Sequence, residues 1–358
     1  MLFELPMIIY LVTFGTIYLA ITFKIRRLPG KTAKDFGNEL LTSIMWYVGA
    51  VIYPFAYSPD ITTETRDYFN IFTDIAMIGI FLVILFIVTR EKILLIKKPE
   101  IKDTRDFESF AINFKSEYTL KRDIDRKAFH LIIPAFVLFM YILGTFLASW
   151  LSIGFVSGHD LGIFLIINCG FGGLFLFAAA DMLRLSYFFK DQGISVFHLL
   201  PTTVLNILTK RMHAKELFTF IPTVLILLSF IPFLPAPFAV FGTITLIASI
   251  SDAMASIFGK AFSQSFPGHG VFPSSKYRYF KSKTIAGYLA GFIATFLIAW
   301  VMLIAFPVPE LSLNALIWTP LLTATAFILV DILSLQVNDN FLNPVVCGLV
   351  MLACLLIP

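Results

Sequence analysis

An aspartate inside an apolar segment is the first residue of this sequence that could do chemistry. Asp252 lies in the stretch LIASISDAMASIFGK, whose other residues before the final lysine are apolar or small. An ionised carboxylate is costly in hydrocarbon unless it is paired or solvated, so we expect Asp252 to face a bundle interior or a wet cavity. At helical spacing Ser249, Ser256 and Gly259 share its face, and small residues let another helix or a ligand approach closely. The pattern predicts a functional carboxylate; the alternative is a structural ion pair with Lys or Arg.

The next segment contains residues that suit phosphate binding. Residues 260–283 include Lys260, Lys281 and Lys283 together with Gly268 and Gly270, and lysines with nearby backbone amides can hold an anion. Thr284 and Ser282 are the candidate N-caps of the following helix, and a cap there would leave its first amides directed at that anion. The alternative is a solvated basic loop on anionic lipid. The GK pair is not a Walker loop, since the GxxxxGK[ST] spacing is missing.

A third polar stretch, DILSLQVNDNFLNP, supplies oxygen ligands near the end of the chain. Asp331, Asn338, Asp339 and Asn340 offer the hard oxygens that Mg²⁺ prefers when it also binds substrate phosphates. The alternative is an Asx turn that caps the last helix. We therefore predict a metal site formed by Asp252, Asp331, Asp339 and Asn340.

Two further motifs contain charged residues next to apolar segments. In DIDRKAFH, Arg126 and His130 share a helical face and Lys127 lies between them in sequence. His130 is a candidate catalytic residue, and a hydrogen-bonded structural histidine is the alternative. In ADMLRLSYFF, Asp181 and Arg184 have the i, i+3 spacing of an ion pair. Asp74, also inside an apolar segment, has no partner pattern and stays unassigned.

The elements that must position these residues are transmembrane helices. The chain of 358 residues is 58% hydrophobic and only 14% charged, whereas soluble domains are about 25% charged. A bilayer core of about 30 Å needs about 20 apolar residues in a helix. We predict an all-α, polytopic bundle with about ten spans at residues 5–23, 40–57, 71–89, 128–156, 161–180, 217–234, 236–259, 284–306, 313–334 and 341–357.

The basic residues predict the orientation of this bundle. Of the 27 Lys and Arg residues, 26 fall in alternate loops, namely 24–39, 90–127, 181–216 and 260–283. By the positive-inside rule these loops are cytoplasmic, and both termini are then on the non-cytosolic side. The same face favours anionic membrane lipids as partners. Asp252 and Asp331 then lie near the cytoplasmic surface, alongside the basic loops.

Taken together, these motifs resemble those of the CTP-dependent polyprenol kinase family, which includes dolichol kinase, phytol kinase and CTP-dependent diacylglycerol kinase. DRKAFH is similar to the family's RK-x-x-H start, and ADMLRL to its acid–LRL segment. SDAMASIFGKAF, the most specific match, resembles its (G/S)DA-x-A-x-x-x-G-(R/K)-x-F motif. KSKTIAG and DILSLQVNDNFLNPVV resemble its two later elements. The resemblance covers residues 120–358, whereas residues 1–119, the N-terminal helices and a charged cytosolic loop, match nothing.

The resemblance implies transfer of the CTP γ-phosphate to the hydroxyl of a membrane isoprenoid alcohol, with Mg²⁺ on the phosphates. Asp252 then either helps to bind Mg²⁺ or accepts the alcohol proton, and Lys260, Lys281 and Lys283 neutralise phosphate charge. The other nucleotide-binding residues expected are Gly259, Thr284, Arg126 and Lys127. The chain departs from the family at Ala286, where Glu is usual, at Asp331, which replaces Glu with one residue inserted, and in an extra PGHGVFPSS.

Two other function classes compete with the kinase. A cytidylyltransferase that makes a CDP-lipid from CTP has similar Asp–Gly–Lys requirements, and it would release pyrophosphate instead of CDP. A lipid or solute transporter would use Asp74 and Asp252 as pathway residues, although no inverted repeat is evident. No nucleic-acid partner is expected. The predicted location is the plasma membrane of a prokaryote or the ER membrane of a eukaryote.

Overall fold

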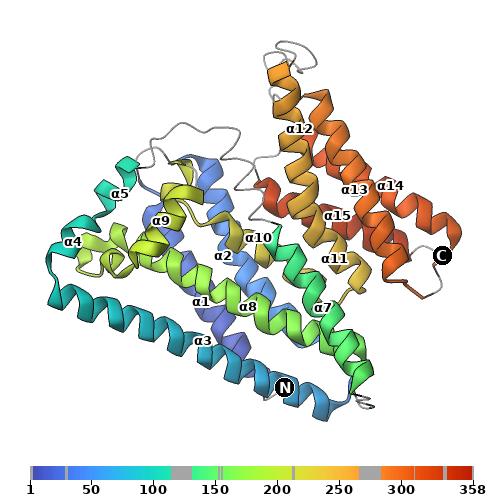
Figure 1. Cartoon of the computed structure of the whole chain (residues 1–358), viewed down its shortest axis with the longest axis horizontal. Coiled ribbons are helices and arrows are strands. Elements are labelled where there is room, and N and C mark those ends of the chain that lie inside the picture. The colour runs from blue at the N-terminus through green and yellow to red at the C-terminus, as the bar shows by residue number, and fades with distance from the viewer. Residues whose placement is uncertain are drawn as a thin grey trace. The chain divides into compact units, whose positions relative to one another are not determined.

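The structure is a computed structural model that describes residues 3–28, 31–113, 131–151, 154, 156–211, 214–265, 284–309, 311–333 and 337–356. The described residues form helices and no β-sheet, so the predicted all-α class is confirmed for them. The chain divides into two compact units, whose helices Figure 1 labels and colours by residue number. Residues 164–228 belong to the first unit with the N-terminal helices, so these units do not coincide with the division at residues 119 and 120 drawn from the motifs.

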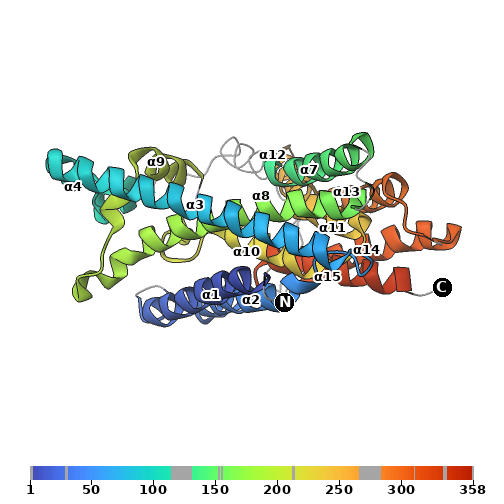
Figure 2. The same ribbon diagram turned by 90° about the horizontal axis from the view of Figure 1, so that it is seen from below.

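The first unit contains the N-terminal helices and the middle of the chain. Its elements are α1 (Leu5–Ile25), α2 (Ala33–Ile52), η1 (Tyr53–Phe55, except Phe55), α3 (Thr63–Lys97), α4 (Glu100–Thr104), α5 (Phe107–Asn113), most of α8 (Gly158–Leu185), η2 (Ser186–Gln192), η3 (Phe197–Leu199), α9 (Thr202–Arg211), η4 (Ala214–Phe218) and most of α10 (Pro222–Phe230). α1 and α2 pack side by side (Figure 2). Stacked rings of Phe14, Trp46 and Phe175 join α1 and α2 to α8.

The second unit contains the C-terminal helices and all the described residues of the predicted site. Its elements are α7 (Ile132–Trp150), the start of α8, η5 (Ile231–Phe233), α11 (Phe238–Leu246), η6 (Ile247–Ser251), α12 (Asp252–Ser265), α13 (Ile285–Ala305), α14 (Leu313–Leu333) and α15 (Asp339–Leu356). α13 packs against α11, α12 and α14, and α15 packs against α11 and α14. α11 and η6 are almost wholly buried and form the centre of this unit.

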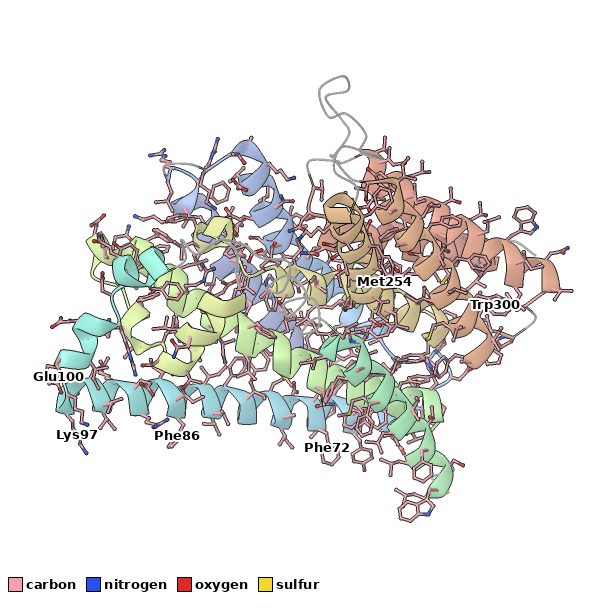
Figure 3. The ribbon with its side chains drawn as sticks, turned by 45° about the horizontal axis from the view of Figure 1, so that its top comes forward. Phe72, Phe86, Lys97, Glu100, Met254 and Trp300 are labelled. Atoms are coloured by element: carbon pink, nitrogen blue, oxygen red, sulfur yellow. The ribbon has the colours of Figure 1, made fainter. Side chains whose placement is uncertain are left out.

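Among the described residues, eight helical segments are long and apolar enough to cross a membrane. The chain is therefore a multi-pass membrane protein. Their outward faces are apolar: Phe72 and Phe86 project from α3, and Trp300 from α13 (Figure 3). Such a surface suits lipid and not water. The predicted spans 40–57 and 217–234 are not among the eight. The first half of α2 carries Asp35, Glu39 and other polar residues, and the second segment is cut into the short elements α10 and η5.

In the second unit, α7 and the start of α8 approach through glycine. A Cβ at Gly144 would lie 2.5 Å from both Cα and N of Gly162, closer than real Cβ atoms come to backbone. Beside this contact the Tyr141 hydroxyl bonds His159 Nδ1 at 3.0 Å, and the Tyr141 ring stacks on Phe238. A residue without a side chain at position 144 is therefore required for these helices to cross where they do.

We expect Gly144→Ala to destabilise the protein, because the backbone of Gly162 cannot move away without separating the helices. The cost is at least about 2 kcal/mol, measured by denaturant or thermal unfolding of the purified protein in detergent. Gly170→Ala on α8 is the matched control, since a Cβ there meets no atom within 4 Å and alanine favours the helix. Equal unfolding midpoints for the two variants would contradict the close approach of α7 and α8 at Gly144.

Candidate functional site

Asp252 begins α12 directly after a π-helical turn. This turn, η6, is buried, with Ser249 and Ser251 among its buried residues, whereas Asp252 itself is partly exposed. π turns inside α-helices are frequent at functional sites because they change the direction of the side chains that follow. The π turn also interrupts the regular α-helical spacing between Ser249 and Asp252 on which the prediction of a shared face relied. Ser256 and Gly259 follow within α12 and are partly exposed like Asp252.

Two elements of the predicted nucleotide site are in direct contact. Thr284 is the N-cap of α13, as predicted: its Oγ1 accepts from Gly287 N at 3.1 Å and lies 3.3 Å from the Gly259 carbonyl oxygen, to which it donates. A Cβ at Gly287 would come within 2.8 Å of the Ala255 oxygen, so α12 and α13 approach closely at this point. The GK pair of one motif and the first turn of the next helix therefore form one corner of the unit, and Lys260 is exposed there.

Asp331 lies on α14, close to the helix that carries Asp252. Phe327, one turn before Asp331, packs in one cluster with Ile247 and Cys347. A Cβ at Gly291 of α13 would lie 2.6 Å from the Phe327 ring and 3.1 Å from Ala255 Cβ. Because Ile247 and Ala255 flank Asp252 in the sequence, α14 passes this part of the chain one turn before Asp331. The carboxylate of Asp331 is buried, with 1% of the residue exposed.

Asp339 and Asn340 are the first two residues of α15. Asn338 caps this helix, since its Oδ1 accepts from Asn340 N at 3.0 Å and its carbonyl oxygen accepts from Phe341 N and Leu342 N. The alternative interpretation of this stretch, an Asx cap, therefore holds for Asn338. It leaves the side chains of Asp339 and Asn340, both partly exposed, as the candidate ligands.

Two buried polar residues near this region were missed in the sequence. Ser251 Oγ and Asn343 Oδ1 have no hydrogen-bond partner among the described residues, although both residues are almost fully buried. Their elements, η6 and α15, are in contact. Ser251 immediately precedes Asp252, and Asn343 lies one turn after Asp339, so proximity to the predicted ligands was the available signal. A buried polar atom without a partner carries a desolvation cost that a bound polar group would offset.

The described carboxylates of the predicted metal site do not form a cluster of three ligands. Within the described part of the chain, no three His, Cys, Asp or Glu side chains are grouped so that they could hold an ion. The predicted set of Asp252, Asp331 and Asp339 therefore does not form a protein-only cage. One or two carboxylates with substrate phosphates and water are nevertheless the usual way in which proteins bind Mg²⁺, and the partly exposed Asp252 and Asp339 fit that donor chemistry. The other predicted site residues, namely Arg126, Lys127, His130, Lys281 and Lys283, lie outside the described residues.

The first unit contains a separate buried ion pair. Arg184 Nη2 lies 2.6 Å from Asp181 Oδ1, and both side chains are at most 1% exposed. Arg184 also donates to the backbone oxygens of residues 216, 217 and 219, while Asp181 Oδ2 accepts from Ile221 N at 2.8 Å and from the Tyr18 hydroxyl at 3.3 Å. The pair thus satisfies the backbone groups between η4 and α10. This network confirms the predicted i, i+3 ion pair and its structural interpretation.

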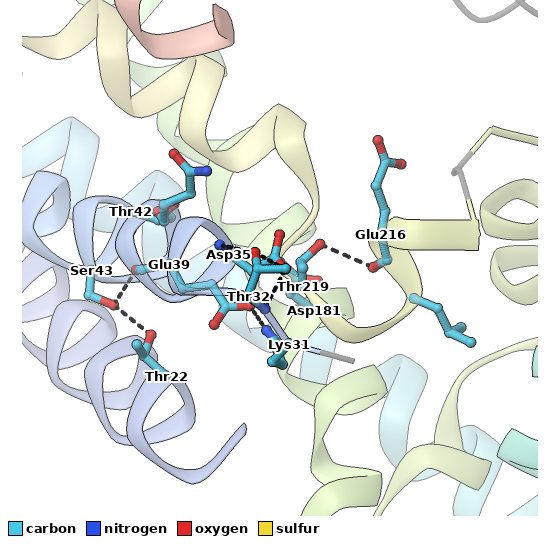
Figure 4. A network of polar contacts seen from close by, with 12 residues as sticks. Thr22, Lys31, Thr32, Asp35, Glu39, Thr42, Ser43, Asp181, Glu216 and Thr219 are labelled. Atoms are coloured by element: carbon cyan, nitrogen blue, oxygen red, sulfur yellow. Dashed lines mark hydrogen bonds and ion pairs between the residues drawn. The ribbon is translucent and has the colours of Figure 1, made fainter. Parts of the chain in front are cut away.

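A second buried ion pair, between Lys31 and Glu39, lies beside the first. The charge of Asp181 acts on Glu39, and the charge of Arg184 acts on Lys31. Figure 4 shows Lys31, Glu39 and Asp181 grouped together. Burial raises the pKa of Glu39 to about 7, against the opposing effect of Lys31, while Asp35 and Asp181 raise it further. The carboxyl therefore binds a proton more tightly in the folded protein than in the unfolded chain.

We expect the stability of the protein to fall as the pH rises from about 4.5 to about 7 because Glu39 ionises in its buried position. Below pH 4.5 the carboxyl is protonated in both states and the penalty is absent. The change attributable to Glu39 is on the order of 3 kcal/mol. It is obtained by subtracting the unfolding profile of Glu39→Gln, which keeps the shape and does not titrate. Parallel profiles for the two proteins would contradict the shift.

Comparisons with protein families, with curated proteins and with solved structures find no match to this chain. A functional proposal for it therefore depends on its own motifs and geometry.

Proposed function

We propose that this protein is a CTP-dependent kinase that phosphorylates the hydroxyl of a membrane isoprenoid alcohol. The observation that carries the proposal is the contact between two motifs that are separate in sequence. Thr284 belongs to KSKTIAG, and its Oγ1 lies 3.3 Å from the carbonyl oxygen of Gly259, which belongs to SDAMASIFGKAF. Lys260 directly follows Gly259, and Lys283 directly precedes Thr284 in the sequence, with Lys281 two residues before Lys283. The corner thus contains Lys260 and the N-terminus of α13, a combination that suits a nucleotide phosphate.

The chemistry needs positioning and charge neutralisation more than covalent help. The alcohol oxygen forms a bond to the γ-phosphorus while the bond to the β-phosphate oxygen breaks, so that CDP leaves and the hydroxyl proton is released. In the proposal Asp252 either receives that proton or, with Asp339, holds Mg²⁺, which when bound neutralises phosphate charge. Lys260, the helix start at Thr284 and the lysines before it contact the phosphates.

The charge pattern supports ten crossings and a cytoplasmic site. If only the eight longest apolar segments crossed, the basic loop 98–131 would lie on the same side as loop 306–312, which has no Lys or Arg. With α2 and the α10–η5 segment also crossing, nearly all basic residues share one side. In this topology the Asp252 region lies near the cytosolic surface, where CTP meets an alcohol whose tail stays in the bilayer, and both termini are on the opposite side.

The test is an assay of the purified protein with γ-labelled CTP, Mg²⁺ and separate lipid alcohols: dolichol, phytol, geranylgeraniol and diacylglycerol. We expect labelled lipid phosphate from at least one isoprenoid alcohol, together with CDP. Pyrophosphate and a CDP-lipid formed from a lipid phosphate would instead establish the cytidylyltransferase. Well-folded protein that labels none of the alcohols contradicts the kinase, and solute movement in vesicles without nucleotide would favour a transporter.

A further inference from the structure

The first unit contains a polar group of side chains at the packed face of α3. The aromatic rings of Phe69 and Phe164 stack where α3 meets α8, and one turn further Asn168 Nδ2 donates to Thr73 Oγ1 at 3.3 Å. On the same face the Tyr53 hydroxyl donates to Asn70 Oδ1 at 2.8 Å. All of these side chains except Tyr53 belong to two candidate membrane spans, Thr63–Lys97 and Gly158–Gln192, where polar groups are rare unless they have partners or a function.

Two atoms of this group have no hydrogen-bond partner among the described residues. They are Asn70 Nδ2, a donor on a residue that is 1% exposed, and Asp74 Oδ1, an acceptor that is shielded from solvent. Asn70 and Asp74 are spaced i, i+4 on α3 and therefore neighbour one another. Asp74 Oδ1 is shielded from solvent one helical turn after Asn70. The two unpartnered atoms do not bond each other; because side chains at i and i+4 are neighbours on a helix, a single oxygen atom between them is the simplest group that satisfies both a donor and an acceptor.

The group that fits between a donor and an acceptor is a hydroxyl. Its oxygen accepts from Asn70 Nδ2 and its hydrogen is donated to Asp74 Oδ1, which satisfies both atoms. The surface next to Asp74 is apolar, because Phe72, Ile75 and Ile78 are each about half exposed or more on the lipid-facing side of α3. A hydroxyl that reaches this position from the membrane is therefore attached to an apolar body.

We propose that Asn70 and Asp74 bind the hydroxyl group of a membrane lipid alcohol at the first unit. This site is distinct from the Asp252 region of the second unit, and the inference does not rest on the proposed kinase activity. It also accounts for Asp74, the intramembrane acid to which no role was assigned. A buried water molecule between the same two atoms is the competing occupant.

The test uses photolabelling of the full chain in lipid nanodiscs without nucleotide. The probes are a long-chain primary alcohol bearing a diazirine near the hydroxyl and the matched methyl ether, which keeps the acceptor and lacks the donor. We expect the alcohol to label peptides from residues 63–97 or 158–185 at least fivefold more than the ether. Asp74→Leu removes the acceptor and should bring alcohol labelling down to the ether level. Asp74→Asn keeps an acceptor oxygen and should retain most of the preference.

Glu64→Gln is the matched control, since Glu64 is exposed on the same helix, and it should leave the labelling unchanged. Thermal unfolding confirms that each variant is folded. Equal labelling by alcohol and ether, or an alcohol preference that survives Asp74→Leu, would overturn the site and indicate bound water. Alcohol labelling confined to residues 238–356 would also overturn it, while leaving the kinase proposal intact.

Discussion

Asp252→Asn is expected to lower the rate of phosphoryl transfer from CTP to lipid alcohol by at least about 10³-fold. The substitution keeps the shape of the side chain and removes its negative charge, and either proposed role of Asp252 requires that charge. Proton acceptance by a positioned base is worth about 10²–10⁴-fold, and loss of a carboxylate ligand weakens charge neutralisation at the phosphates. The residue lies two positions before Met254 on α12 (Figure 3) and is partly exposed, so the change should not disturb packing.

The measurement is the initial rate with γ-labelled CTP and the best alcohol, at several Mg²⁺ concentrations. A defect that excess Mg²⁺ partly restores would indicate a ligand role, and one that is independent of Mg²⁺ would indicate a base. Asp191→Asn is the matched control, because Asp191 is an exposed aspartate of the first unit, and it should keep the wild-type rate. If Asp252→Asn also kept that rate in folded protein, Asp252 would be removed from the site.

Arg184→Met is expected to destabilise the protein by about 3–5 kcal/mol, the cost of leaving a buried charge without its partner. The variant leaves Asp181 buried and leaves the backbone oxygens of residues 216, 217 and 219 without their donor. Methionine fills much of the same volume, so the loss reports on charge and hydrogen bonds more than on a cavity. The readout is denaturant unfolding in detergent.

Arg90→Met provides the matched control, since the Arg90 side chain is 69% exposed and exposed ion pairs contribute little. The double variant Asp181→Leu, Arg184→Met should recover part of the loss because it removes the orphaned carboxylate, although the Ile221 amide then loses its acceptor. Similar stability of Arg184→Met and Arg90→Met would show that the buried network does not hold η4 and α10 in place.

The membrane class and much of the helical layout could be predicted because they follow from local composition. Apolar runs long enough to span a bilayer fold as helices, since no water is present to satisfy free backbone groups. Thr284 could be predicted as a cap because a threonine before an apolar run supplies an acceptor for free amides, and the structure shows that bond. The weakest predictions concerned α2 and α10, where polar residues in the first half of one segment and prolines near the other shorten the apolar helix.

The sequence by itself determined that this is a helical membrane protein with acidic and basic motifs in a stated order, since residue type and short-range spacing encode those properties. Only the tertiary structure decided that Gly259 meets Thr284, that α14 passes the Asp252 region beside Phe327, and that Lys31 and Glu39 lie beside Asp181. Those contacts join residues that are distant along the chain. They depend on how helices cross and on a π turn that redirects side chains, and neither feature is encoded in local spacing.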